Sequence, residues 1–294
     1  MVPPDRLASL IARGDAEGGV TPWDAIALFN APEEQRKRFI EKFCPPLPAN
    51  YAPLKSEPEG VSRAISEDAD GWGRQWSREH WTEDNWRIYR WVYARQTEHL
   101  DRQAGVILNA LRKSNYLNRT LVVFTSDHGD MNGAHRLEQK ALPFENCMRV
   151  PFIMSYPGTI PAGQVSDRLV SNGLDLYPTL CDYAGIKLPP GRLGVSLREL
   201  AEGKTPKTWR DLVPVEFEYG WAIRTPTLTY ALFNCGANPE MLVDREKDPD
   251  ETVNFAPDPA HAATLKACRE MMRGWAKHCG DAPLLEKMKE MFGA

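Results

Sequence analysis

The segment that most constrains the fold begins at Leu121 and reads LVVFTSDHGDMNGAHRLEQKALPFENCMRVP. The strand expected here, Thr120–Thr125, lacks polar alternation, which is typical of a strand buried on both faces of a parallel sheet. The strand ends in Asp127 and His128, a carboxylate and an imidazole that can both bind metal ions. Open α/β sheets keep their ligands beside the carboxyl ends of their strands. The segment therefore predicts an α/β fold with a candidate metal site at the end of this strand.

Further elements of the same kind flank this strand. A second central strand is expected at Val150–Tyr156, and a helix at Leu174–Ala184 that ends at Gly185. A long helix is expected from Glu83 to about Ser114, with Thr82 as its N-cap. Helix followed by central strand, twice, predicts a mixed, mostly parallel sheet flanked by helices. Apolar side chains at three- and four-residue steps predict one buried stripe on the long helix: Tyr93, Leu100, Ala104, Ile107, Leu108 and Leu111.

The N-terminal part is expected to be helical, with short helices at Asp5–Arg13, Pro22–Phe29 and Glu33–Phe43. Residues 45–81 form a connector with too many prolines for regular structure. Tryptophans gather around the start of the long helix, and they either stack sugar rings or anchor a core. We favour the core interpretation, because it is the commoner role of tryptophan beside a long helix. These residues are Trp72, Trp76, Trp81, Trp86 and Trp91.

The pattern changes after Gly203, where short β-like segments alternate with turn-sized gaps. The segments are Leu212–Phe217, Trp221–Arg224, Thr227–Phe233 and Met241–Val243, and a helix from Pro259 to about His278 follows them. This succession predicts a small antiparallel sheet capped by a helix. We therefore expect an α/β domain over residues 1–205 and a smaller C-terminal subdomain over residues 206–294.

The composition excludes several classes of partner. With 36 basic and 40 acidic side chains and no long basic run, the chain lacks the charge pattern of a nucleic-acid-binding protein. No apolar run approaches the ~20 residues of a membrane span. The start, MVPPDRLASL, lacks the apolar core of a signal peptide, so no compartment is assigned and export of a longer parent stays open. The six cysteines contain no CxxC pair, which argues against structural zinc and a disulfide framework, and Cys147 and Cys181 are expected to be buried thiols.

Five segments, in order, resemble the sulfatases of the alkaline-phosphatase superfamily. They are TSDHG, GAHRLEQK, FENCMRVPF, SNGLDLYPTLCDYAGI and MLVDREKDPDETVNFAPDP. The resemblance implies a large α/β domain around a mixed sheet, with a small C-terminal antiparallel sheet. It also implies a metal-dependent hydrolase that cleaves sulfuric esters, with a sulfated small molecule or glycan as substrate. The cation implied by the family is usually calcium.

The resemblance assigns roles to individual residues. Asp127 and His128 match a pair of metal ligands, and the imidazole of His128 keeps Mn²⁺ or another transition metal as an alternative to Ca²⁺. Lys140 matches a catalytic lysine that contacts the sulfate and steadies the leaving oxygen. His135 either faces the substrate as a catalytic residue or packs its loop. Arg224 is a candidate for binding an anionic substrate.

Plainer roles compete with these assignments. An aspartate at a strand end can simply cap a turn, and a lysine in a polar loop is often solvated surface. Glu145 and Arg149 are expected to form a buried pair that braces the loop, and Asp175 to organise the start of its helix. The sequence context favours the functional roles for Asp127, His128 and Lys140.

One part of the family pattern is missing. The nucleophile of sulfatases is made from a cysteine or serine in a C-x-P-S-R-like motif, and the nearest imitation, Cys44 to Pro48, has proline where arginine is required. The family's paired N-terminal aspartates are missing too. The resemblance therefore implies the C-terminal part of a sulfatase, without a nucleophile and with uncertain activity alone. The alternatives are a phosphodiester or phosphonate monoester hydrolase and a non-catalytic remnant.

Such a truncated α/β domain has a physical consequence. A sheet without its upstream strands exposes an edge and leaves apolar helix faces uncovered. We therefore expect exposed apolar side chains and a tendency to aggregate.

Overall fold

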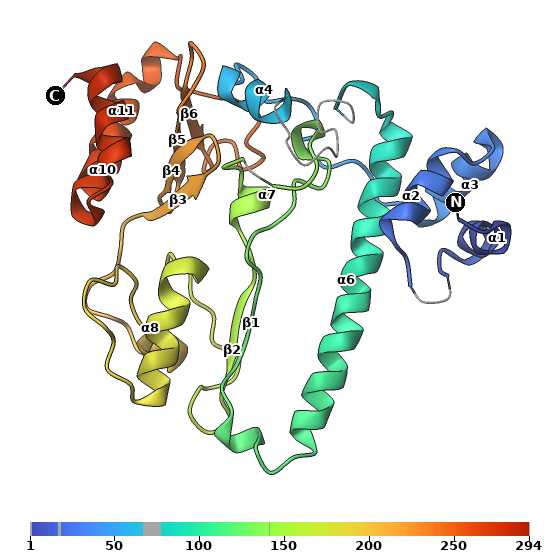
Figure 1. Ribbon diagram of the computed structural model, residues 1–294, viewed down its shortest axis with the longest axis horizontal. Coiled ribbons are helices and arrows are strands. Elements are labelled where there is room, and N and C mark those ends of the chain that lie inside the picture. The colour runs from blue at the N-terminus through green and yellow to red at the C-terminus, as the bar shows by residue number, and fades with distance from the viewer. Residues whose placement is uncertain (1, 17–18, 67–77, 141, 294) are drawn as a thin grey trace. The chain divides into compact units, whose positions relative to one another are not determined.

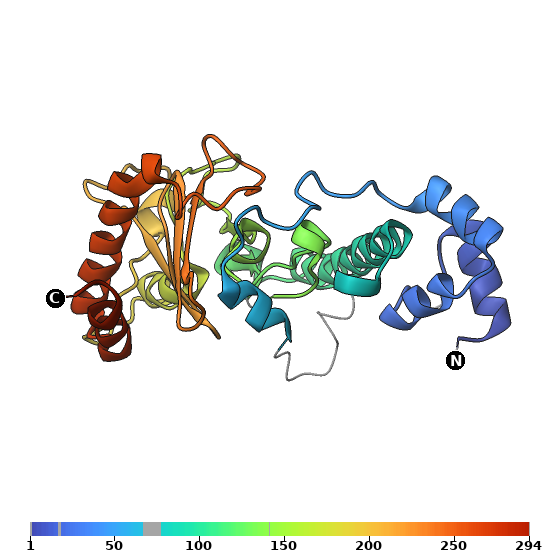
Figure 2. The ribbon, with the colours of Figure 1, turned by 90° about the horizontal axis from the view of Figure 1, so that it is seen from above.

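The computed structural model describes residues 2–16, 19–66, 78–140 and 142–293 (Figure 1, and from above in Figure 2). The chain divides by its internal contacts into two compact units. The first contains residues 1–53, 68–116 and 130–139, and the second contains residues 54–67, 117–129 and 140–294. The boundary that we expect near residue 205 stays a prediction. Within the described residues, no helix is both long and apolar enough to cross a membrane.

The first unit consists mainly of four helices. They are α1 (Pro4–Arg13), α2 (Pro22–Phe29), α3 (Glu33–Phe43) and the long α6 (Glu83–Arg112). Thr82 caps α6, because its hydroxyl accepts a hydrogen bond from the Asn85 backbone N–H. The prediction of three short helices and one long one is confirmed.

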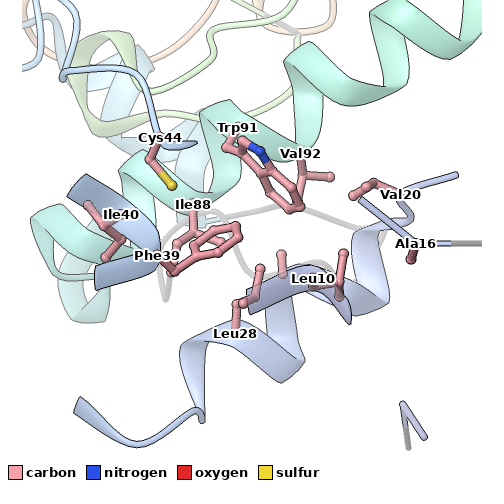
Figure 3. Close-up of a cluster of buried hydrophobic side chains, with 11 residues drawn as sticks. Leu10, Ala16, Val20, Leu28, Phe39, Ile40, Cys44, Ile88, Trp91 and Val92 are labelled. Carbon is pink, nitrogen blue, oxygen red and sulfur yellow. The ribbon is translucent and has the colours of Figure 1, made fainter. Parts of the chain in front are cut away.

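The core of this unit lies where α1–α3 meet the first turns of α6, as Figure 3 shows. Phe39 of α3 packs edge-to-face on Trp91 of α6, with ring centroids 4.8 Å apart. Trp86 and Trp91 are both buried, so the core interpretation holds for them. Trp72 and Trp76 lie outside the described residues. The cluster also contains Leu10, Leu28, Ile40, Ile88 and Val92.

The prediction of a buried stripe along α6 is wrong for the largest side chains of that stripe. Tyr93, Leu100 and Ile107 are exposed, Ile107 by 70%, whereas Ala104, Leu108 and Leu111 are half-buried. The reason is that α2 and α3 cover only the beginning of α6 (Figure 1). Apolar periodicity marks a face that can be buried, whereas the residues that α6 contributes to this core cluster are Ile88, Trp91 and Val92.

The second unit contains a two-stranded ribbon of β1 (Val122–Thr125) and β2 (Phe152–Ser155). The strands occur where expected, but they pair antiparallel, with Val122 opposite Ser155, rather than parallel. Phe124 and Ile153 are exposed, so within the described residues this ribbon is not the two-sided core strand pair that the sequence predicts. The reason is the same as for α6, because apolar strands indicate burial without supplying the covering layer.

Four short or medium helices accompany the ribbon in this unit: α4 (Glu59–Ser66), α7 (Glu145–Met148), α8 (Asn172–Ala184) and α9 (Arg198–Ala201). The helix expected before Gly185 is α8, and Gly185 closes it in the left-handed conformation at φ 65°. The prediction that residues 45–81 lack regular structure is wrong at α4. The run of prolines ends at Pro58, so the next eight residues can form a helix.

The C-terminal sheet is confirmed as a four-stranded antiparallel meander in chain order. Its strands are β3 (Val213–Phe217), β4 (Gly220–Arg224), β5 (Leu228–Phe233) and β6 (Glu240–Asp244). The helices α10 (Ala262–Cys279) and α11 (Ala282–Phe292) cover one face of it (Figure 2). The sequence pattern predicts α10 but not α11. With this sheet and the helices around β1 and β2, the predicted α/β class is confirmed. The remaining described elements are short 3-10 turns at Leu117–Arg119, Ala134–Arg136 and Pro259–His261.

Candidate active site

The loop after β1, residues 126–129 (the site loop), is ordered by its own hydrogen bonds. The Ser126 hydroxyl donates to the His128 carbonyl over 2.8 Å. The His128 backbone N–H donates to Asp127 Oδ1 over 2.9 Å. This hydrogen bond, together with the nearby imidazole, holds the pKa of the Asp127 carboxyl below its ordinary value. Asp127 is therefore ionised at neutral pH, as a cation ligand must be.

The two candidate ligands lie side by side. Asp127 Oδ2 is 3.4 Å from His128 Nε2, and the two side chains are 81% and 40% exposed. His128 Nδ1 lies 2.8 Å from the Gly129 carbonyl oxygen. Because a carbonyl can only accept, Nδ1 is the donor in this contact, and Nε2, on the side of the Asp127 carboxylate, is the ring atom left to bind a cation. One oxygen and one nitrogen are thus available to the same cation.

The donor set fits a metal ion only in part. In the described portion of the chain, no group of three or more His, Cys, Asp or Glu side chains is arranged to hold a metal. Calcium takes about six to eight oxygen ligands, so Asp127 and His128 would supply a minority of its coordination positions. These residues fit part of a cation site, and the remaining positions would go to water or to further ligands.

Two neighbours hold the site loop from outside. The Gly129 N–H donates to the Cys147 carbonyl over 2.8 Å, and a Cβ on Gly129 would lie 2.0 Å from the Asn146 carbonyl oxygen. Only glycine permits this close approach to α7. On the other side, the Asn172 amide donates to the carbonyls of Ser126 and Asp127, over 2.6 and 3.0 Å. Asn172 lies in the SNGLD segment but is not among the site residues predicted from the sequence.

Asp127, His128 and Lys140 border one open cavity of about 830 Å³ in the second unit. Lys140 is an exposed residue here. Asn172 of α8 and Cys147 of α7 line the same cavity, and so do residues of β3 and β4. The structure therefore brings the two predicted ligands and the predicted lysine to the wall of a shared space.

His135 is placed differently. It belongs to the first unit, is fully buried and has a left-handed backbone at φ 54°. Its backbone N–H donates to the Asn50 carbonyl over 2.7 Å, and its Nδ1 lies 3.2 Å from the Ala52 carbonyl oxygen. Of the two roles considered for His135, these contacts are those of loop packing.

Arg224 is engaged with a carboxylate. Its guanidinium binds Glu145 through two contacts, of 2.5 and 3.0 Å, and it borders a second cavity of about 1220 Å³. Burial alone would raise the pKa of Glu145, but the hydrogen bond and charge of Arg224 hold it below its ordinary value. The expected Glu145–Arg149 pair is wrong, because Arg149 is exposed and Glu145 pairs with Arg224 and, at 3.5 Å, Arg245.

Asp175 organises the start of α8, as predicted. It is fully buried and accepts hydrogen bonds from the backbone N–H groups of Ser171, over 2.8 Å, and Val195, over 3.0 Å. Arg210 neutralises it through a contact of 2.5 Å. This buried pair fixes the end of α8 that carries Asn172.

Two family profiles match the sequence. The profile described as Sulfatase matches residues 41–186, and the profile described as N-sulphoglucosamine sulphohydrolase, C-terminal, matches residues 133–278. The chain is 35% identical over 203 residues to a Delta 4,5-hexuronate-2-O-sulfatase from Bacteroides thetaiotaomicron, covering 66% of this chain and 42% of the relative. It is 35% identical over 216 residues to a choline-sulfatase from Rhizobium meliloti, covering 70% and 41%. The chain thus spans about two fifths of the length of these relatives.

Solved structures show the same likeness. A 2-O GAG sulfatase superimposes with a TM-score of 0.73 at 28% identity, covering 88% of this chain and 62% of that protein. A phosphonate monoester hydrolase of Agrobacterium radiobacter superimposes with a TM-score of 0.69, also at 28% identity, covering 86% and 55%.

Proposed function

Because this chain belongs to the sulfatase family, we propose that it carries the cation- and oxyanion-binding part of a sulfuric ester hydrolase site. The observation that supports the proposal is the cavity shared by Asp127, His128 and Lys140. Two ligands beside a strand end and a lysine on the same wall suit a substrate that is an oxyanion. The proposed reaction is cleavage of a sulfate ester.

Each residue has a distinct role in this proposal. Asp127 and His128 would hold the divalent cation, with calcium as the first candidate and manganese as the alternative. When bound, the cation supplies Lewis-acid polarisation of the sulfate oxygens. Lys140 places its ammonium group toward the sulfate and stabilises charge on the leaving oxygen.

The nucleophile is not among the residues of this site. No C-x-P-S-R sequence occurs in the chain, so these residues bind and orient the ester rather than attack it. We therefore expect the purified 294-residue chain to bind the cation and the anion, with slow or no turnover of aryl sulfate.

The substrate class is a sulfate ester of a sugar or of another small alcohol. Relatives at 35% and 31% identity are a Delta 4,5-hexuronate-2-O-sulfatase and an N-acetylglucosamine-6-O-sulfatase, and another at 35% is a choline-sulfatase. A second candidate is phosphonate monoester hydrolysis, which the structural similarity to the Agrobacterium radiobacter enzyme favours. The two candidates share the oxyanion and differ in its central atom.

Manganese binding by the purified chain tests the proposal. Electron paramagnetic resonance of free Mn²⁺ gives the dissociation constant, which we expect to be ~10⁻³ M because the proposed site has two protein ligands, Asp127 and His128. Asp127→Asn should weaken binding at least about tenfold. Asp167→Asn, which removes an exposed carboxylate of the same unit, should leave it unchanged. Equal affinity in wild type and Asp127→Asn would contradict the proposed cation site.

The same titration separates the two candidate functions. Sulfate and phenylphosphonate are added in turn, and each should tighten Mn²⁺ binding if it shares the cavity. A stronger effect of sulfate supports the sulfuric ester hydrolase, and a stronger effect of phenylphosphonate supports the alternative.

A further inference from the structure

The side chain of Asn172 touches the site loop twice. Its Nδ2 atom donates to the Ser126 carbonyl over 2.6 Å and to the Asp127 carbonyl over 3.0 Å. An amide nitrogen has two N–H donors, and the site loop takes both of them. Asn172 Oδ1 accepts from the Gly173 backbone N–H over 2.9 Å, which keeps the nitrogen turned toward the loop.

The N-terminus of α8, which carries Asn172, is itself held in place. Ser171 caps α8 by accepting from the Leu174 N–H over 3.3 Å. Asp175, one turn into the helix, is buried in its pair with Arg210. A side chain that holds another element is effective only when its own position is determined, and these contacts determine it.

Of the two carbonyls that Asn172 binds, that of Ser126 comes immediately before the candidate ligand pair, and that of Asp127 belongs to its first member. The hydrogen bond between Gly129 and Cys147 holds the other end of the site loop. Between these two points lie Asp127 Oδ2 and His128 Nε2, 3.4 Å apart, on exposed side chains whose hydrogen bonds go to groups of the site loop itself. Their separation therefore depends on the backbone, and the backbone at Asp127 depends on Asn172.

We propose that Asn172 is a positioning residue that holds Asp127 and His128 in cation-binding geometry through the carbonyls of Ser126 and Asp127. It does not bind the cation itself. The inference rests on the proposed function in one respect, because it predicts that the affinity for the cation falls when the amide is removed. Its structural part, the restraint of the site loop, is testable without a metal.

Asn172→Asp gives the sharpest test, because positioning and simple electrostatics predict opposite results. A carboxylate at this place faces two carbonyl oxygens and cannot donate to either, so the loop loses its restraint. Coulomb attraction alone would make the added negative charge tighten cation binding. We expect Asn172→Asp and Asn172→Ala to weaken Mn²⁺ binding about tenfold, the size found for groups that orient metal ligands. Asn238→Asp, at an exposed site of the same unit, should change nothing.

Hydrogen exchange without metal provides the second measurement. Amide exchange in a peptide covering residues 121–131 should be about tenfold faster in Asn172→Ala than in wild type, since the loop opens locally more often. Unchanged exchange, or Asn172 variants that bind Mn²⁺ like wild type while Asp127→Asn does not, would overturn the positioning role alone. Loss of the Asp127 dependence would overturn the proposed function and this inference with it, even if exchange accelerates.

Discussion

The C-terminal sheet and the β1–β2 ribbon, both in the second unit, are built from short antiparallel strands but differ in how far their apolar side chains are buried. In the sheet, Tyr230 to Phe233 of β5 are fully buried, and α10 and α11 supply the covering layer. In the ribbon, Phe124 is 42% and Ile153 58% exposed. The sheet carries its own core, whereas the ribbon presents apolar surface.

Polar contacts follow the same division. In the C-terminal sheet, the Tyr230 hydroxyl donates to Glu240, and Arg269 of α10 binds the same carboxylate, so a partly buried network joins sheet and helix. At the end of the ribbon, two hydrogen bonds from the Asn172 amide and one from the Gly129 N–H hold the site loop. The candidate site therefore lies on the less self-supporting region, where few contacts set the geometry of exposed side chains.

The largest expected effect separates the cores of the two regions. Leu232→Ala removes a fully buried side chain from the C-terminal sheet and should lower the free energy of unfolding by about 2–5 kcal/mol. Ile153→Ala, the matched change in the ribbon, should cost less than about 1 kcal/mol because the side chain is mostly exposed. Urea unfolding followed by circular dichroism measures both. Equal losses would show that the ribbon is as well packed as the sheet.

Arg224→Ala tests the connection between the regions, because Arg224 of β4 pairs with Glu145 of α7. Removing it leaves Glu145 without its main partner and beside Glu251, whose carboxyl group accepts from the Glu145 N–H over 2.7 Å. We expect a loss of about 2 kcal/mol, below the range for fully buried pairs because both side chains keep some exposure. Arg149→Ala, at an exposed arginine nearby, is the control and should be near neutral. An unchanged free energy of unfolding in Arg224→Ala would show that the Arg224–Glu145 pair does not stabilise the protein.

The pH dependence of stability probes the same junction at Glu251. Burial raises the pKa of Glu251 to about 8, from an ordinary value of 4.5. Between these values the folded state holds a proton that the unfolded state has lost, so this group's contribution to stability falls as pH rises from about 5 to 8. Glu251→Gln removes the titration, and its stability should rise relative to wild type over that window by on the order of 1–3 kcal/mol. Parallel stability curves from pH 5 to 8.5 would show that Glu251 does not titrate as described.

The smallest expected effect on stability concerns the exposed apolar surface of the ribbon. Phe124→Ser together with Ile153→Ser should change the free energy of unfolding by less than about 1 kcal/mol. The double variant should nevertheless raise solubility, because it removes adjacent apolar side chains from a short ribbon with open edges. Light scattering against protein concentration measures this. An unchanged onset of aggregation would mean that other surface dominates.

The local signals in the sequence predict the elements well. Prolines and capping residues mark the starts of the first three helices, and Thr82 marks the start of α6. Short segments separated by turns mark the C-terminal meander. What they cannot predict is the covering layer. The apolar periodicity of Leu100 and Ile107, and the unbroken apolar run of β1, indicate faces that suit burial, yet the structure leaves Leu100, Ile107 and Phe124 exposed.

The candidate site is predictable to a similar extent. Asp127, His128 and Lys140 follow from family motifs, and they line one cavity as those motifs suggest. Asn172 could not be found this way, because its role depends on two backbone carbonyls that carry no sequence identity. Arg224 shows the opposite case, since its residue type suits an anion while its geometry commits it to Glu145.

The coupling between sulfate and manganese tests the central claim most directly, namely that Lys140 faces the oxyanion bound at Asp127 and His128. The measurement compares the dissociation constant of Mn²⁺ with and without sulfate, in wild type and in Lys140→Ala. We expect sulfate to tighten Mn²⁺ binding severalfold in wild type, and this coupling to disappear in Lys140→Ala while affinity for Mn²⁺ alone stays the same. A coupling of equal size in the two proteins, or none in wild type, would contradict the account.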